Sequence, residues 1–332
     1  MGERLNKVGE IRAYEKLLRT LLRNFRLQNA QRGKDMKRIR PFRYLEVGTV
    51  SEAVGVLARE GVGAYPLAGG TDLLVRMKRG DLGPGALVNL KRIAGLDGIA
   101  KESGGLRIGA LATIGAVERS SVVRASHPVL VEAAGLLGSP SIRNLGTLGG
   151  NMGRASPASD MAPSLIVLRG RVCIEGVEGK REVAVEEFFK GPGETVLSSG
   201  EMITSVYVPE MAEGSGAAYL KMGRREGMDC ALVGVAGYLA LGRKGREVRE
   251  VGLAVAACAP LPLRLKRAEE VLLSGSLTEA RLKEAARVVA EEVTPISDMR
   301  GSGWYRREVA GVLAYRVLER AWKLAEGDGG GR

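Results

Sequence analysis

Two glycine-rich segments carry the residues in this chain best suited to chemistry. Gly69–Asp72 and Thr147–Asn151 lie about eighty residues apart, and each joins consecutive glycines to small polar residues. Because glycine adopts positive φ and has no Cβ, consecutive backbone N–H groups can converge on phosphate oxygens. The side chains of Thr71, Thr147 and Asn151 add further donors. Together the two segments indicate a clamp for a diphosphate.

Either glycine pair alone is more simply explained as an ordinary tight turn, since the chain has 47 glycines. Neither segment has the G-x-G-x-x-G or G-x-x-x-x-G-K-[ST] pattern, which disfavours Rossmann and P-loop folds. A polar loop with Ser156, Ser159 and Asp160 follows the second segment and leads into the apolar residues 161–168. Asp160 either binds sugar hydroxyls of a ligand or caps a helix. The sequence leaves both roles open.

Metal binding and histidine catalysis find little support in the composition. Cys173, Cys230 and Cys258 are odd in number, far apart and without C-x-x-C spacing. This argues against a disulfide framework, a zinc site or an iron–sulfur cluster held by this chain. The single histidine, His127, precedes Pro128 at the start of an expected helix and is interpreted as structural. We expect no catalytic residue and no metal ligand.

Length and charge limit the classes of protein to which the chain can belong. The 332 residues suffice for two or three domains. The net charge of +12 is concentrated in residues 1–43, which hold 13 Lys or Arg and 4 Asp or Glu, so the remainder is close to neutral. No basic stripe with interleaved aromatic residues indicates nucleic-acid binding. Without a long apolar run or a signal-peptide pattern, we expect a cytoplasmic protein with no membrane span.

Hydrophobic periodicity predicts the elements that position the two segments. Thr49–Glu52 has the pattern of a capping box that begins a helix through Arg59. Thr71 or Asp72 caps a short helix ending at Gly80, which places the first glycine segment at a helix N-terminus, where the dipole also favours a phosphate. Residues 1–35 form an amphipathic pattern through Ile11, Tyr14, Leu17, Leu18, Leu21, Leu22 and Phe25.

Further along, strands are expected at 86–90, 106–110, 171–174 and 202–208, a helix at 128–137, and a loop at 186–193. After a glycine-rich boundary at 212–216 come strands at 217–222, 231–241 and 248–257, then helices at 264–274, 278–293 and 302–325. Strands followed by helices, without β-α alternation, indicate an α+β fold.

The motifs resemble those of a known family, the FAD-binding medium subunits of molybdenum hydroxylases, which include carbon-monoxide, xanthine and aldehyde dehydrogenases. The resemblance runs in the family's order from about Met36 to about Leu324. It is carried by Leu67–Leu74, Ile142–Asn151, Ser156–Pro163, Phe188–Pro192, Glu201–Pro209 and Ala218–Arg225. Ser141 stands where the family often has Gln, and no cysteine-bearing insertion of the hydroxybenzoyl-CoA reductase subgroup is present.

The resemblance implies an FAD-binding fold of the vanillyl-alcohol-oxidase type, with two α+β subdomains at about 36–94 and 95–212. A C-terminal α+β domain, an antiparallel sheet with helices, would span 213–325, and a Gly-rich tail 326–332. Residues 1–35 are a basic extension outside the resemblance. They are either a docking helix or translated sequence upstream of a true start at Met36.

The resemblance also implies the residues that bind non-covalent FAD. Ile203 would lie against the isoalloxazine ring, or else be a core strand residue, and Lys221 would lie near the flavin, or else be a solvated charge at a strand end. The implied set is Leu67, Ala68, Gly69, Gly70, Thr71, Asp72, Leu73, Leu74, Thr147, Leu148, Gly149, Gly150, Asn151, Ser156, Asp160, Ile203 and Lys221.

In such a complex, a large subunit with the molybdenum cofactor oxidises the substrate, and a small subunit with two [2Fe–2S] clusters carries electrons to FAD. The implied assembly is a heterotrimer or its dimer, in which this chain holds and tunes the flavin. Two other classes stay open: a self-contained flavin oxidase of the same fold, and a basic nucleic-acid-associated protein. The lack of an added substrate domain opposes the first, and the confinement of charge to the N-terminus opposes the second.

Overall fold

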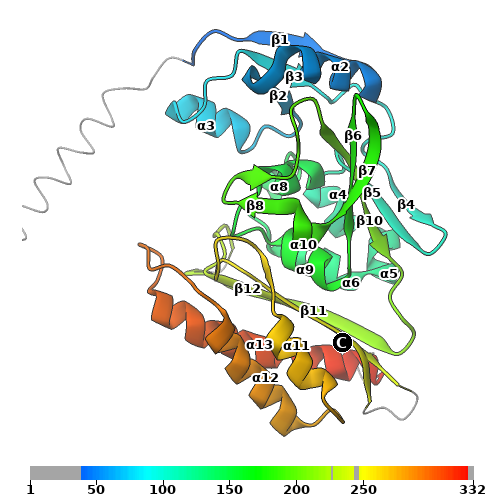
Figure 1. The fold of residues 1–332 in the computed structure, drawn as a ribbon, viewed down its shortest axis with the longest axis vertical. Helices are drawn as coiled ribbons and strands as arrows, with labels where there is room; N and C mark the ends of the chain where they lie inside the picture. The colour runs from blue at the N-terminus through cyan, green and yellow to red at the C-terminus, as the bar shows by residue number, and fades with distance from the viewer. Residues whose placement is uncertain (1–38, 226, 243–246, 328–332) are drawn as a thin grey trace, which may run out of the picture.

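The chain folds into three lobes that follow one another along the long axis of the molecule (Figure 1). The computed structural model describes residues 39–225, 227–242 and 247–327. The amphipathic pattern expected in residues 1–35 therefore lies outside the described residues, as does most of the Gly-rich tail. Within the described ranges, no helix is both long and apolar enough to cross a bilayer.

The N-terminal lobe is a parallel sheet with the strand order β1-β3-β2, formed by β1 (Arg43–Glu46), β2 (Ala64–Leu67) and β3 (Ala86–Asn89). Helices α2 (Val50–Glu60) and α3 (Leu73–Arg79) connect its strands, with a short 3-10 turn η1 (Gly61–Gly63) after α2. Parallel neighbours require such crossovers. The expected strand at 86–90 corresponds to β3, and the structure adds β1 and β2 beside it.

Thr49 caps α2 as expected, but the reciprocal bond from Glu52 reaches Gly48, one residue before the position that a capping box predicts. The Thr49 hydroxyl accepts a hydrogen bond from the Glu52 N–H at 3.1 Å, and the Glu52 carboxylate accepts one from the Gly48 N–H at 2.8 Å. The helix ends at Glu60, and the C-cap residue Gly61 has a φ of 66°, which is accessible to glycine at little cost. The helix therefore runs one residue beyond the expected end at Arg59.

The central lobe is an antiparallel sheet with the strand order β4-β5-β10-β6-β7, and short helices pack beside it (Figure 1). Its strands are β4 (Ile99–Glu102), β5 (Gly105–Gly109), β6 (Arg171–Gly176), β7 (Gly179–Ala184) and β10 (Met202–Pro209). Its helices are α4 (Ile114–Arg119), α5 (Ser121–Ser126), α6 (Pro128–Leu136), α7 (Pro140–Arg143), α8 (Leu148–Arg154) and α9 (Met161–Val167).

Two expectations about this lobe are wrong. The expected loop at 186–193 includes α10 (Val185–Phe188) and β8 (Phe189–Gly191), and β8 pairs with β9 (Glu194–Thr195). Phe188 and Phe189 are both buried in the core, which orders this segment. The polar loop expected directly after the second glycine segment begins only at Ala155, because Thr147 caps α8, which runs to Arg154; Ser156, Ser159 and Asp160 lie in this loop as expected.

The C-terminal domain is an antiparallel sheet covered on both faces. It consists of β11 (Ser215–Met222), β12 (Val233–Leu241), β13 (Val248–Ala256) and β14 (Leu263–Arg264), followed by α11 (Lys266–Leu273), α12 (Glu279–Glu292) and α13 (Gly303–Ala325). Along β12, Val233, Val235 and Leu239 pack with the helices, whereas Ala236 and Tyr238 join the core of the central lobe. This alternation follows the period of a strand. The expected antiparallel sheet with three helices is confirmed.

A buried arginine fastens α13 to the strands. Arg306 is 1% exposed and donates to the carbonyl oxygens of Leu232 at 3.0 Å and Ala257 at 3.1 Å. It also donates to Asp298 at 2.6 Å. Burial acts to raise the pKa of Asp298, but hydrogen bonds from Arg300 and Arg306 hold that pKa well below its usual range. Arg306 thus joins three segments that are distant in sequence.

Replacing Arg306 by Met should destabilise the protein by about 3 kcal/mol, because two buried carbonyl groups would lose their hydrogen-bond donor. Urea unfolding of the flavin-free protein measures this change. Arg307, the exposed neighbour on the same helix, provides the matched control, and Arg307→Met should change stability by about 0.5 kcal/mol or less. Equal effects of the two substitutions would contradict the role assigned to Arg306.

Candidate functional site

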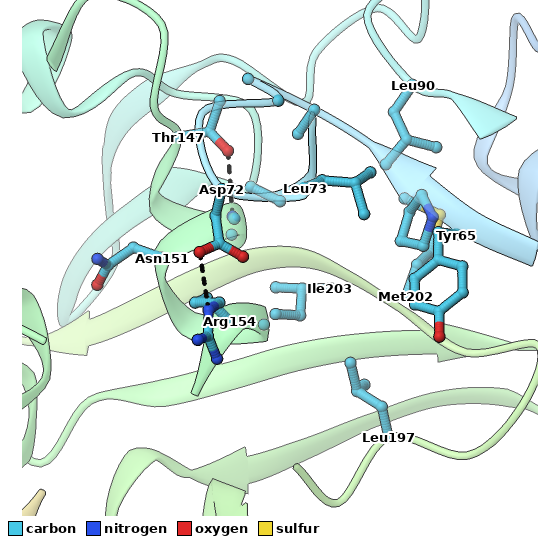
Figure 2. A pocket seen from close by; sticks show the side chains of 18 of the residues that line it. Tyr65, Asp72, Leu73, Leu90, Thr147, Asn151, Arg154, Leu197, Met202 and Ile203 are labelled. Atoms are coloured by element: carbon cyan, nitrogen blue, oxygen red, sulfur yellow. Dashed lines mark hydrogen bonds and ion pairs between the residues drawn. The ribbon is translucent and has the colours of Figure 1, made fainter. Parts of the chain in front are cut away.

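A cavity of about 600 Å³ lies between the N-terminal and central lobes. Its size falls within the range of small-molecule sites, roughly 300–1,000 Å³. Residues from both glycine segments line it, together with the start of β10 (Figure 2). The expected cofactor residues in its wall are Ala68, Gly69, Gly70, Thr71, Asp72, Leu73, Thr147, Gly149, Gly150, Asn151 and Ile203.

The first glycine segment offers unpaired backbone donors to this cavity. No acceptor among the described residues receives a hydrogen bond from the backbone N–H of Gly69, Gly70, Thr71 or Asp72. Gly70 has φ of 71°, a conformation that residues with a Cβ rarely adopt. Because unpaired N–H groups are costly unless solvated or bonded to a ligand, this segment is suited to binding an anion.

The second glycine segment is engaged differently. It forms the first turn of α8, where the Thr147 hydroxyl accepts from the Gly150 N–H at 3.1 Å. The N–H groups of Leu148, Gly149 and Asn151 donate to the carbonyl oxygens of Ala112, Ala110 and Thr147, each at 2.9 Å. The prediction that both segments present consecutive free amides therefore applies only to the first.

The second segment contributes side chains instead. Ser159 donates its hydroxyl proton to Asn151 Oδ1 at 2.7 Å, which leaves the amide nitrogen of Asn151 as a donor at the cavity wall. The Thr147 hydroxyl accepts from Gly150 and retains its own proton to donate. Figure 2 shows Asp72 near both Thr147, the N-cap residue of α8, and Asn151, which lies on that helix.

Six residues of the expected set do not line the cavity. Leu67 and Leu148 are buried in hydrophobic clusters, and the Ser156 hydroxyl accepts from the Ala158 N–H at 3.3 Å. The other three are Leu74, Asp160 and Lys221. For all six, contact with a cofactor stays a prediction.

Asp160 forms a buried polar cluster with two residues of β11. Its carboxylate accepts from Lys221 Nζ at 3.0 Å and from the Tyr219 hydroxyl at 2.8 Å. Lys221 Nζ also donates to the carbonyl oxygen of Leu136 at 2.9 Å. The side chains of Asp160 and Lys221 are each only 7% exposed. This cluster therefore joins the C-terminal domain to the central lobe.

Two alternatives left open by the sequence are thereby wrong. The Asp160 carboxylate makes no capping bond to α9; the Ser159 hydroxyl accepts from the Ala162 N–H at 3.3 Å instead. Lys221 is not a solvated charge at a strand end, because it is buried against Asp160. Burial raises the pKa of the Asp160 carboxyl, and the charge of Lys221 and the Tyr219 hydroxyl act in the opposite direction.

Several cavity residues were not identified from the sequence. Arg154, the last residue of α8, donates from Nε to Asp72 Oδ1 at 2.9 Å. Arg76 and the segment 197–202 also line the cavity. An apolar part of its wall includes Tyr65, Leu90, Leu197 and Met202 (Figure 2). Only Arg154 had a local signal, because it lies inside the polar segment that follows Asn151.

His127 is buried and makes two hydrogen bonds within the protein. Its Nε2 lies 2.8 Å from the carbonyl oxygen of Pro209, and its Nδ1 lies 2.9 Å from the Ser126 hydroxyl. Burial lowers the pKa of His127, so the ring is neutral at pH 7. Across the ranges that the structure describes, no group of three or more His, Cys, Asp and Glu side chains is placed to hold a metal ion.

The cavity wall thus combines unpaired amides, side-chain donors and an apolar part. Known proteins that resemble the chain indicate its family. Residues 40–211 match a family model described as the FAD binding domain in molybdopterin dehydrogenase. Residues 217–321 match the CO dehydrogenase flavoprotein C-terminal domain.

Relatives match along most of the chain. The carbon monoxide dehydrogenase medium chain of Hydrogenophaga pseudoflava is 34% identical over 85% of this chain and 97% of its own length. The glyceraldehyde dehydrogenase medium chain of Sulfolobus acidocaldarius is 33% identical over 84% of this chain and 97% of its own length.

Solved structures show the same fold. Carbon monoxide dehydrogenase from Hydrogenophaga pseudoflava superposes with a TM-score of 0.82 at 34% identity, over 85% of this chain and 97% of the other. Quinoline 2-oxidoreductase from Pseudomonas putida 86 gives 0.81 at 28% identity, over 87% and 99% of the two chains. This chain therefore belongs to the FAD-binding medium subunits of the molybdenum hydroxylases, and it is an oxidoreductase subunit.

Replacing Asp160 by Asn should destabilise the protein by about 3 kcal/mol, because the buried Lys221 ammonium would lose its counter-charge. In the double variant Asp160→Asn/Lys221→Met the loss should be smaller than the sum of the two single losses. Urea unfolding measures each variant. Glu279→Gln, which disrupts an exposed ion pair with Lys283, is the control and should leave the free energy of unfolding nearly unchanged. Strict additivity of the two losses would contradict the assigned pairing.

Proposed function

We propose that this chain binds FAD non-covalently in the cavity between its N-terminal and central lobes. The observation that carries this proposal is the run of four unpaired backbone N–H groups at Gly69–Asp72 in the cavity wall. A diphosphate offers acceptor oxygens and negative charge to such a run. Thr147 and Asn151 add side-chain donors from α8.

The remainder of the cavity is suited to an aromatic ring. Leu90, Leu197, Met202 and Ile203 provide an apolar surface against which a flavin would exclude water. None of the cavity-lining residues in the described chain is a His or Cys that could form a covalent flavin link. We propose that the FAD-binding domain has a fold of the vanillyl-alcohol-oxidase type.

The proposed reaction is electron transfer in a larger complex. FAD, when bound, supplies chemistry that accepts single electrons and passes on two. We propose that the electrons come from two [2Fe–2S] clusters of a small partner subunit, after a large subunit with the molybdenum cofactor has oxidised the substrate. The relatives named as medium chains support this assembly, as a heterotrimer or its dimer. The role of this chain is to hold the flavin and exclude water.

We also propose residue limits for the domains and a cellular location for the protein. The FAD-binding domain spans 36–212, with subdomains at about 36–94 and 95–212, and the C-terminal domain spans 213–325. The two family matches, at 40–211 and 217–321, support this division. The proposed location is the cytoplasm. A self-contained flavin oxidase is the weaker alternative, since the relatives are subunits of dehydrogenase complexes.

Replacing Gly70 by Val should abolish FAD binding, because a β-branched residue resists φ of 71° and the turn would lose its open amides. Isothermal titration of the flavin-free protein with FAD measures this. Gly95 has φ of 83°, lies outside the cavity and has open space around it, so Gly95→Val is a control with comparable backbone strain. FAD affinity of Gly70→Val within about threefold of the control would refute the proposed site.

The purified chain should show almost no dehydrogenase activity toward aldehydes, purines or carbon monoxide. Substrate-dependent dye reduction should appear once the iron–sulfur and molybdenum subunits are added, since these hold the other redox groups. The flavin-loaded chain alone and the reconstituted complex are compared in one dye-reduction assay. Full activity from the single polypeptide would favour the self-contained oxidase instead.

A further inference from the structure

An ion pair crosses the cavity beside the unpaired amides. Arg154 Nε donates to Asp72 Oδ1 at 2.9 Å, and the two side chains are 36% and 46% exposed. Asp72 lies at the start of α3 in the N-terminal lobe, and Arg154 ends α8 in the central lobe (Figure 2). The pair thus connects the two elements that carry the glycine segments.

Asp72 poses an electrostatic problem for an anion site. Its carboxylate belongs to the same residue as the last of the four unpaired N–H groups, so a diphosphate bound there would lie close to a like charge. Like charges repel more strongly as the distance and the local dielectric constant decrease. Asp72 makes no capping bond to α3 that would explain a carboxylate at this position.

Arg154 is placed to offset that charge. The other acidic residue in the cavity wall, Glu201, is neutralised from outside the cavity by Arg181, whose Nε donates to it at 2.7 Å. Within the described residues, Asp72 forms its ion pair with Arg154. Without the Arg154 guanidinium, the Asp72 carboxylate would lose this ion pair and its charge would lie beside the amides of the first glycine segment.

The backbone around Arg154 fixes its side chain. Ala155, which follows it, is buried and has φ of 47°, and its carbonyl oxygen accepts from the Gly193 N–H at 2.9 Å. A Cβ on Gly193 would lie 3.3 Å from Arg154 Nη1. The guanidinium therefore lies close against the β8–β9 turn, within reach of Asp72.

We propose that Arg154 is an affinity-determining residue for the cofactor, which acts by neutralising Asp72 so that a diphosphate can occupy the Gly69–Asp72 amides. This inference rests on the proposed FAD site. It assigns to Arg154 a role through Asp72 and not as a phosphate ligand in its own right. The two roles differ in whether the effect of replacing Arg154 depends on the presence of the Asp72 carboxylate.

The test compares FAD affinities of flavin-free Arg154→Ala, Asp72→Asn and the double variant by isothermal titration. Arg154→Ala should bind FAD about tenfold more weakly, because it exposes the Asp72 charge. Asp72→Asn should bind as tightly as wild type or more tightly. The double variant should regain an affinity within about threefold of Asp72→Asn, since the charge that Arg154 offsets is then absent.

Two controls test whether each variant is folded and whether a loss of FAD affinity comes from net charge alone. Thermal melts of the flavin-free variants report whether each remains folded. Arg79→Ala removes a positive charge from exposed α3 surface outside the cavity and should leave FAD affinity unchanged within about twofold. If Arg79→Ala lost as much FAD affinity as Arg154→Ala, net charge alone would explain the effect, and the inference would be overturned.

Other outcomes are equally decisive. A double variant as weak as Arg154→Ala would mean that Arg154 contacts the ligand directly, which overturns the role through Asp72. Asp72→Asn as weak as Arg154→Ala would indicate a mechanical link between lobes, and unchanged affinity in Arg154→Ala would remove any role. Failure of the wild-type chain to bind FAD would instead overturn the proposed function on which the inference rests.

Discussion

The close approach of two loops holds the site together. A Cβ on Gly69 would lie 1.9 Å from the carbonyl oxygen of Leu145, so only glycine permits this contact. The contact sets the first glycine segment against the loop that leads into α8, and so brings the two segments to one cavity. The role of Gly69 is therefore chain packing, whereas the amides of the same turn remain available to a ligand. One turn serves both the fold and the site.

Much of the fold could be predicted from sequence because its signals are local. The N-cap residue Thr49 and the continuous apolar run of β12 are each recognised from neighbouring residues. Strands β1 and β2 were missed because they are four residues long and mostly not buried, whereas β3, of the same length, is fully buried and was expected. The residue types identified the glycine segments, but only the hydrogen bonds distinguish the open amides of Gly69–Asp72 from the engaged ones of α8.

The polar residues were harder to interpret, because a charged side chain does not reveal its partner. Asp160 and Lys221 are 61 residues apart and meet only when the C-terminal domain packs on the central lobe. Arg154 and Asp72 are 82 residues apart and meet only when the first two lobes do. Neither pair is indicated by the spacing of its two residues in the sequence. Their partners follow from tertiary packing, which sequence periodicity does not encode.

These pairs have different consequences for the cavity. The Asp160 cluster is buried and lies outside the cavity wall, yet the residue before it, Ser159, holds the Asn151 amide that lines the cavity. The packing of the C-terminal domain is thus linked to the cavity wall through the hydrogen bond from Ser159 to Asn151 and the peptide unit that joins Ser159 to Asp160. The Asp72–Arg154 pair is partly exposed within the cavity wall itself. The C-terminal domain is thus linked to the wall through Asp160 and Ser159, whereas the N-terminal and central lobes each contribute one charge of this pair to the wall directly.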